Sequence, residues 1–166
     1  MPLSATVFRQ NIFDKFLCDP NQPDQRMNYF RDISTYGGCT GAMAAALENT
    51  RIIEEEQLVE NSRTVGAYLL DALQSISDMP LVGDVRGKGL FCGIEFVRNK
   101  KTKESITEAE MARIMALVTA EGVLAGRTAS SLPGNNTIMN FAPALIATKA
   151  DMDEIVTAVK RAMEKF

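Results

Sequence analysis

The chain has 166 residues, a net charge of −3 and a hydrophobic content of 46%, enough to build a stable core in one or two small domains. The acidic balance argues against a nucleic-acid-binding protein, and no apolar run approaches the length of a membrane span. Histidine is absent, which excludes Ser-His-Asp and Cys-His nucleophile systems and most zinc sites. Three widely spaced cysteines, without a Cys-x-x-Cys pair or a visible signal peptide, fit a cytoplasmic protein with reduced thiols.

The first 36 residues contain more irregular chain than the start of a small domain usually does. Residues 5–8 predict a short strand, residues 10–17 have apolar side chains at helical spacing, and residues 19–24 have the chemistry of a turn. We therefore expect residues 1–56 to be the remnant of a larger domain together with a connecting helix.

Two helices are predicted in the middle of the chain. The first begins at Thr40 with small residues and continues to Glu56. The second has one apolar stripe from Leu58 to Ile76, and Met79-Pro80 ends it.

Residues 81–97 predict a β-hairpin, because two runs of β-forming residues flank a short loop that contains glycine. Gly87 and Gly89 can take positive φ in that loop. The second run alternates little between apolar and polar residues, so we expect both of its faces to be covered. Lys88 is either an exposed turn residue or a reactive amine.

After the hairpin the sequence predicts helix, strand, strand, helix. Thr107 and Glu110 form a capping box at the start of the first helix, and Gly122 ends it. Thr148 caps the last helix. The predicted strands are residues 123–127 and 137–142.

From residue 57 onward the predicted order is helix, strand, strand, helix, strand, strand, helix. Adjacent strands pair locally and the helices gather on one face. This order predicts a two-layer α+β domain over residues 57–166 with a mainly antiparallel sheet.

The first candidate site lies at residues 34–40, where Ser34, Thr35 and Tyr36 precede two glycines and the start of a helix. A helix N-terminus offers unpaired N–H groups to an anion, and hydroxyls can add hydrogen bonds. The pattern is therefore either a phosphate site or an ordinary helix cap after a turn.

The second candidate is Arg127, at the end of a short predicted strand. Its guanidinium can bind a carboxylate or sulfonate through two parallel hydrogen bonds, or it is a surface Arg at a strand end. The basic residues 98–103 predict an exposed loop, with a phosphate or partner patch as the alternative. Cys39 and Cys92 are expected to be inert packing thiols, since no histidine can activate them.

The stretch Leu-Val-Gly-Asp-Val-Arg-Gly-Lys-Gly-Leu at residues 81–90 resembles a signature of the class III pyridoxal-phosphate aminotransferases. Residues 34–38 resemble the phosphate loop of that family, residues 41–47 its Ala-rich helix, and residues 126–155 its last quarter. The resemblance covers most of the chain in order, and the subfamily it resembles most is that of the taurine–pyruvate aminotransferases.

The resemblance implies the small, carboxy-terminal domain of a fold-type-I transferase, with pyridoxal 5'-phosphate as cofactor in the complete enzyme. It implies that Thr35, with Ser34 and Tyr36, contacts the cofactor phosphate of the neighbouring subunit of a homodimer, and that Arg127 binds the acid group of the substrate. The expected substrates are an amino donor, such as taurine or another ω-amino acid, and a 2-oxo acid such as pyruvate. The Schiff-base lysine would lie just before Pro2-Leu3-Ser4, so the chain is expected to lack it and to be inactive alone.

A different class of function also fits the order of elements alone. A non-catalytic α+β module that binds a small ligand or another chain would show the same predicted helices and strands. No metal, nucleic-acid partner or membrane is expected under either hypothesis.

Overall fold

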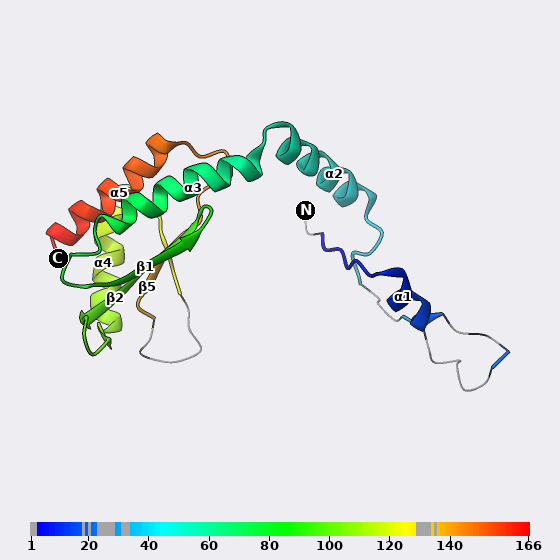
Figure 1. Ribbon diagram of the computed structural model, residues 1–166, viewed down its shortest axis with the longest axis horizontal. Coiled ribbons are helices and arrows are strands. Elements are labelled where there is room, and N and C mark those ends of the chain that lie inside the picture. Colours follow the sequence, from blue (N-terminus) through cyan, green and yellow to red (C-terminus); the bar gives the residue numbers. More distant parts are fainter. Residues whose placement is uncertain are drawn as a thin grey trace. The chain divides into compact units, whose positions relative to one another are not determined.

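The computed structural model divides the chain into two compact units, Met1–Ile52 and Ile53–Phe166 (Figure 1). The described residues are 3–17, 19, 21–22, 29–30, 34–128, 134 and 136–166. The boundary between the units falls inside one helix, α2 (Thr40–Glu55).

The second unit is built on an antiparallel sheet with the strand order β1-β2-β5-β4, and a short strand β3 also pairs with β2. The predicted hairpin is confirmed: Val85 pairs with Ile94 and Lys88 with Phe91. The strands are β1 (Val82–Lys88), β2 (Phe91–Asn99), β3 (Glu104–Ser105), β4 (Gly126–Arg127) and β5 (Ile138–Phe141).

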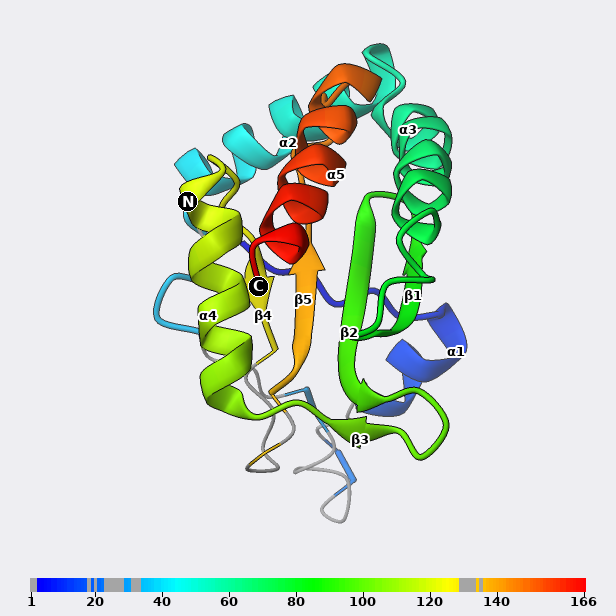
Figure 2. The same cartoon turned by 90° about the vertical axis from the view of Figure 1, so that its left-hand side faces the viewer.

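Three helices cover one face of this sheet (Figure 2), which confirms the predicted two-layer α+β architecture. They are α3 (Leu58–Gln74), α4 (Glu108–Ala120) and α5 (Lys149–Glu164). Alternate residues of the central strands point at them: Ile94 and Phe96 of β2 and Met139 of β5 are fully buried. This core also contains the predicted apolar stripes of the helices, among them Leu69 of α3, Ile114 of α4 and Met152 of α5.

Capping side chains mark the first residues of α4 and α5, and a glycine follows the last turn of α4. Thr107 accepts a hydrogen bond from the Glu110 N–H while the Glu110 carboxylate accepts one from the Thr107 N–H, so the predicted capping box is present. Thr148 and Asp151 form the same arrangement at the start of α5. Helix α4 ends just before Gly122, whose φ of 92° is left-handed.

Several details of the second unit differ from the prediction. The far face of β2 is not fully covered, since Gly93 and Glu95 on it are only half-buried. Gly89 has a positive φ of 56° but Gly87 does not; Gly87 is required instead because an added Cβ would lie 2.5 Å from the Cys92 sulfur. The predicted strand 123–127 is reduced to β4, because only its last two residues pair with β5.

The loop predicted at residues 98–103 is also shorter than expected. Arg98 and Asn99 belong to β2, and the chain turns back at Lys101 so that β3 can pair with β2. All six residues are exposed, as predicted.

The first unit contains α1 (Gln10–Phe13), a 3-10 turn η1 (Asp14–Phe16) and most of α2. Residues 5–8, predicted as a strand of a larger domain, form no ladder with any described residue of this chain. An isolated extended segment cannot satisfy its backbone hydrogen bonds as a strand, so its pairing within a larger domain stays a prediction. The ring of Phe30 contacts the rings of Phe8 and Phe16 edge-on, with centroids 5.4 and 5.8 Å apart.

The predicted turn at residues 19–24 lies partly outside the described residues. Within it, the Asp19 carboxylate accepts a hydrogen bond from the Asn21 N–H at 2.9 Å, as expected for an Asx turn. None of the described helices combines the length and the apolar character that crossing a membrane requires.

Candidate functional site

The predicted phosphate loop is a turn that runs directly into α2. The Ser34 carbonyl accepts a hydrogen bond from the Gly37 N–H at 2.9 Å, and Gly38 has a left-handed φ of 76°. The Cys39 carbonyl then accepts from the Met43 N–H, which marks the first turn of the helix. The N–H groups of that first turn have no acceptor within the helix.

The hydroxyls of this loop are open to solvent. Ser34, Thr35 and Thr40 are all exposed, and Ser34 lines a surface depression together with Gly37 and Gly38. An added Cβ at Gly38 would have no atom within 4 Å, so the backbone there can be approached closely. Hydroxyls, glycines and a helix N-terminus fit a phosphate group.

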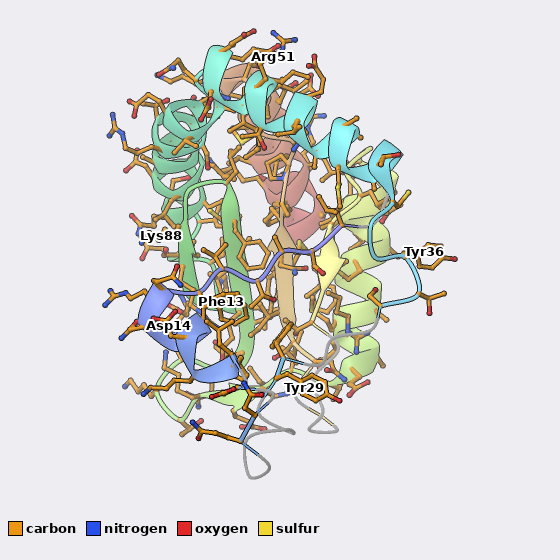
Figure 3. All side chains as sticks on the ribbon, turned by 90° about the vertical axis from the view of Figure 1, so that its right-hand side faces the viewer. Phe13, Asp14, Tyr29, Tyr36, Arg51 and Lys88 are labelled. Atoms are coloured by element: carbon orange, nitrogen blue, oxygen red, sulfur yellow. The ribbon has the colours of Figure 1, made fainter. Side chains whose placement is uncertain are left out.

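Tyr36 is placed differently from its neighbours. Its side chain is 76% exposed and extends away from the loop (Figure 3). It also belongs to the residues that line the depression. Contact with a cofactor at this position therefore requires the ligand to reach the outer side of the loop.

Arg127 lies at the end of β4, at the edge of the sheet, with 28% of its side chain exposed. Its Nε donates a hydrogen bond to the Asn136 carbonyl oxygen at 2.9 Å, and its Nη2 donates to Glu108 Oε2 at 3.1 Å. The side chain is therefore not a loose surface Arg, because two groups from different segments hold one edge of the guanidinium.

Glu108 is a residue of this site that the sequence did not reveal. It is the first residue of α4, and its Oε1 accepts hydrogen bonds from the Gly134 N–H and from Asn136 Nδ2, both at 3.0 Å. The Gly134 and Asn136 hydrogen bonds and the nearby Arg127 charge lower the pKa of Glu108 below its usual value. The partners of Glu108 are 19 to 28 positions away, so only the fold brings them together.

The remaining candidates are the lysines and the cysteines. Seven of the eight lysines, Lys88 among them, are exposed, and Lys160 is half-buried on α5. Cys92 is buried, and burial raises the pKa of its thiol; the expectation that Cys39 is also a packing thiol is wrong, because Cys39 is exposed. The described residues contain no cluster of side chains suited to holding a metal ion.

The comparison with protein families matches residues 1–163 to the description "Aminotransferase class-III". The taurine–pyruvate aminotransferase of Bilophila wadsworthia is 47% identical over 162 residues, which is 97% of this chain and 35% of that protein. The enzyme of the same name from Rhodobacter capsulatus is 45% identical over 99% of this chain and 35% of its own length.

Solved structures agree with the sequence relatives. An aminotransferase of Bacillus anthracis superposes with a TM-score of 0.86 at 36% identity, over 95% of this chain and 34% of that protein. The chain thus spans about a third of the length of the proteins it matches.

Proposed function

Because this chain belongs to the class III aminotransferases, a family that depends on pyridoxal phosphate, we propose that it is the carboxy-terminal part of a transaminase. The proposed reaction moves an amino group from taurine or another ω-amino acid to a 2-oxo acid such as pyruvate. The observation that carries this proposal is the 47% identity to a taurine–pyruvate aminotransferase over 97% of the chain. Residues 1–56 would belong to the large domain and residues 57–166 would be the small domain.

The loop before α2 is proposed to hold the phosphate of the cofactor. Pyridoxal phosphate, when bound, supplies the electron sink for amino transfer. The Thr35 and Ser34 hydroxyls would donate hydrogen bonds to the phosphate, and the N–H groups of the first turn of α2 would add the favourable end of the helix dipole. Because these groups are exposed, they are open to the partner subunit of a homodimer, as the family resemblance implies.

Arg127 is proposed to bind the acid group of the substrate. A guanidinium forms two parallel hydrogen bonds with a carboxylate or a sulfonate, so the same residue can serve both taurine and pyruvate. Arg127 is partly exposed and tethered along one edge, which is the placement that such a role requires.

Amino transfer also needs a reactive lysine amine, and we infer that no lysine of this chain supplies it. A lysine nucleophile is activated in an enclosed pocket or beside another cation, whereas seven of the eight lysines here are exposed. We therefore assign the catalytic lysine to the part of the protein outside these residues and expect this chain to be inactive alone. The assembled enzyme is proposed to act in the cytoplasm.

The role of Arg127 is tested in the assembled enzyme with Arg127→Ala. The account predicts that acid-bearing substrates lose about 2 to 5 kcal/mol of transition-state stabilisation, as for a charge pair broken in a closed site. A donor amine without an acid group should lose far less in a half-reaction that omits the oxo acid. Equal losses for both kinds of donor would make Arg127 a structural residue, and the absence of taurine-dependent alanine formation in the unaltered enzyme would overturn the substrate assignment.

A further inference from the structure

Glu108, Arg127 and Asn136 close a ring of hydrogen bonds at the edge of the sheet. Glu108 accepts from Arg127 through one carboxylate oxygen and from Asn136 Nδ2 through the other, while the Asn136 carbonyl accepts from Arg127 Nε. The Gly134 N–H adds a third hydrogen bond to the carboxylate. Helix α4, strand β4 and the segment before β5 are thus tied together at Arg127.

This ring uses a defined part of the guanidinium. Arginine has five N–H donors, and the ring engages Nε–H and one N–H of Nη2. The other three N–H donors have no partner among the described residues. Two of them lie on Nη1 and one on Nη2, at the outer end of the guanidinium. That end can bind both oxygens of an acid side by side.

We propose that Glu108 is a positioning residue for Arg127, which fixes the guanidinium so that its outer end faces the acid group of the substrate. The inference rests on the proposed role of Arg127 in binding that acid. A long Arg side chain loses rotamer freedom when it binds a ligand, and a tether lowers this cost because the freedom is already lost.

The negative charge of Glu108 makes the proposal sharply testable. If Glu108 acted only through its charge, its removal would strengthen the attraction of Arg127 for an anion, since a nearby carboxylate opposes a second one. A positioning role predicts the opposite, because a released guanidinium must be reordered by each substrate. The two mechanisms therefore differ in the sign of the effect on acid binding.

The experiment uses the assembled transaminase with Glu108→Ala and Glu108→Gln. We expect Glu108→Ala to raise the KM for pyruvate and the inhibition constant of unreactive ethanesulfonate by about tenfold, in the range found for one lost charge-assisted contact. The half-reaction with a donor amine that lacks an acid group, followed by cofactor absorbance, should keep its rate within about twofold. Glu108→Gln keeps one acceptor oxygen for Arg127, so its effect should lie between wild type and Glu108→Ala.

Glu110→Ala is the matched control. Glu110 lies in the same first turn of α4, where it forms the capping box with Thr107 and pairs with Arg98. Among the described residues it hydrogen-bonds neither to Arg127 nor to Gly134 or Asn136. This variant should lose thermal stability while its preference for acid-bearing substrates stays unchanged. If Glu110→Ala shifts that preference as much as Glu108→Ala does, the effect comes from helix stability and the positioning role is overturned.

Arg127→Ala, measured in parallel, separates the two proposals. If Arg127→Ala leaves the preference for acid-bearing substrates unchanged, the proposed role of Arg127 fails and this inference fails with it. If Arg127→Ala weakens acid binding while Glu108→Ala leaves it unchanged or strengthens it, only the positioning role is overturned. Should Glu108→Ala fail to fold, Glu108→Gln alone decides, because a positioning residue still predicts weaker binding of ethanesulfonate.

Discussion

The two units of the chain differ in what becomes of their apolar side chains. In the second unit the stripes of three helices meet the sheet, and residues such as Leu69, Ile94 and Phe96 are completely buried. Among the described residues of the first unit, Ala42 alone is buried, and Val7 and Leu47 are 91% and 74% exposed. An apolar pattern yields a core only where a second layer meets it, and the second unit supplies that layer from its own sequence.

The uncovered side chains of the first unit bear on the proposed function. Apolar residues gathered on a surface mark sites of contact with other protein. The first unit exposes Ile12, Phe13 and Leu17 as well as Val7. This supports the proposal that residues 1–56 belong to the large domain of a transaminase.

The largest expected difference between the units is in hydrogen exchange. Amides of β2 and α3 should exchange only through global unfolding, with protection on the order of 5 to 15 kcal/mol, whereas amides of α1 should exchange almost freely. The measurement is exchange mass spectrometry or NMR on the monomeric chain. Uniform protection across both units would contradict the difference in packing.

Truncating an apolar side chain should cost far more stability in the second unit than in the first. Phe96→Ala removes a fully buried ring, and we expect it to lower the free energy of unfolding by about 3 to 5 kcal/mol. Val7→Ala, at a position that is 91% exposed, should change it by less than about 0.5 kcal/mol. Both values come from urea denaturation, and similar losses in the two variants would refute the assignment of the core to the second unit.

The sequence predicted the second unit well because its signals are local. Capping boxes, the turn at Gly89 and the helical stripes each depend on residues a few positions apart. Three of the four ladders among the described residues join strands that follow one another in the sequence, and only the ladder between β2 and β5 does not. The sequence failed where partners decide the outcome. Residues 5–8 have the composition of a strand but pair with no described residue of this chain. The residues before β4 have a similar composition but lie outside the pairing with β5.

The candidate site shows the same division. Ser34, Thr35 and Arg127 were found from local pattern and family resemblance. Glu108 was missed because its partners come from two other segments, and no spacing rule links a first-turn glutamate to an arginine 19 residues later. Only the meeting of α4 with the edge of the sheet creates that contact.

Helix capping in the second unit offers a smaller effect. Thr148→Ala removes the hydroxyl that accepts from the Asp151 N–H and half of the capping box of α5. We expect a loss of about 1 kcal/mol in the free energy of unfolding. Thr157→Ala, at an exposed position inside the same helix, is the control and should change stability by less than about 0.5 kcal/mol. An equal loss in both variants would show that the cap contributes nothing specific.

The smallest expected effect is the acid sensitivity of the second unit. Hydrogen bonding with Lys165 lowers the pKa of Glu121, and the Thr107 N–H lowers that of Glu110, both below the ordinary value of 4.5. A lowered pKa in the folded state means that the stabilisation is present above pH 4.5 and is lost as the pH falls through the folded value. Glu121→Gln should therefore flatten the fall in melting temperature below about pH 4.5. An unchanged acid profile would show that this ion pair does not favour the folded state.

The proposal that this chain lacks the catalytic amine has one direct test. The purified chain is mixed with pyridoxal phosphate and reduced with borohydride, the labelled lysines are mapped, and amino transfer from taurine and from alanine is assayed. The account predicts scattered, substoichiometric labelling of exposed lysines and no turnover, since seven of the eight lysines are exposed and an activated lysine is desolvated or lies beside another cation. Stoichiometric labelling of a single lysine together with turnover would contradict it, and Lys88 would then be the first residue to examine as the catalytic amine.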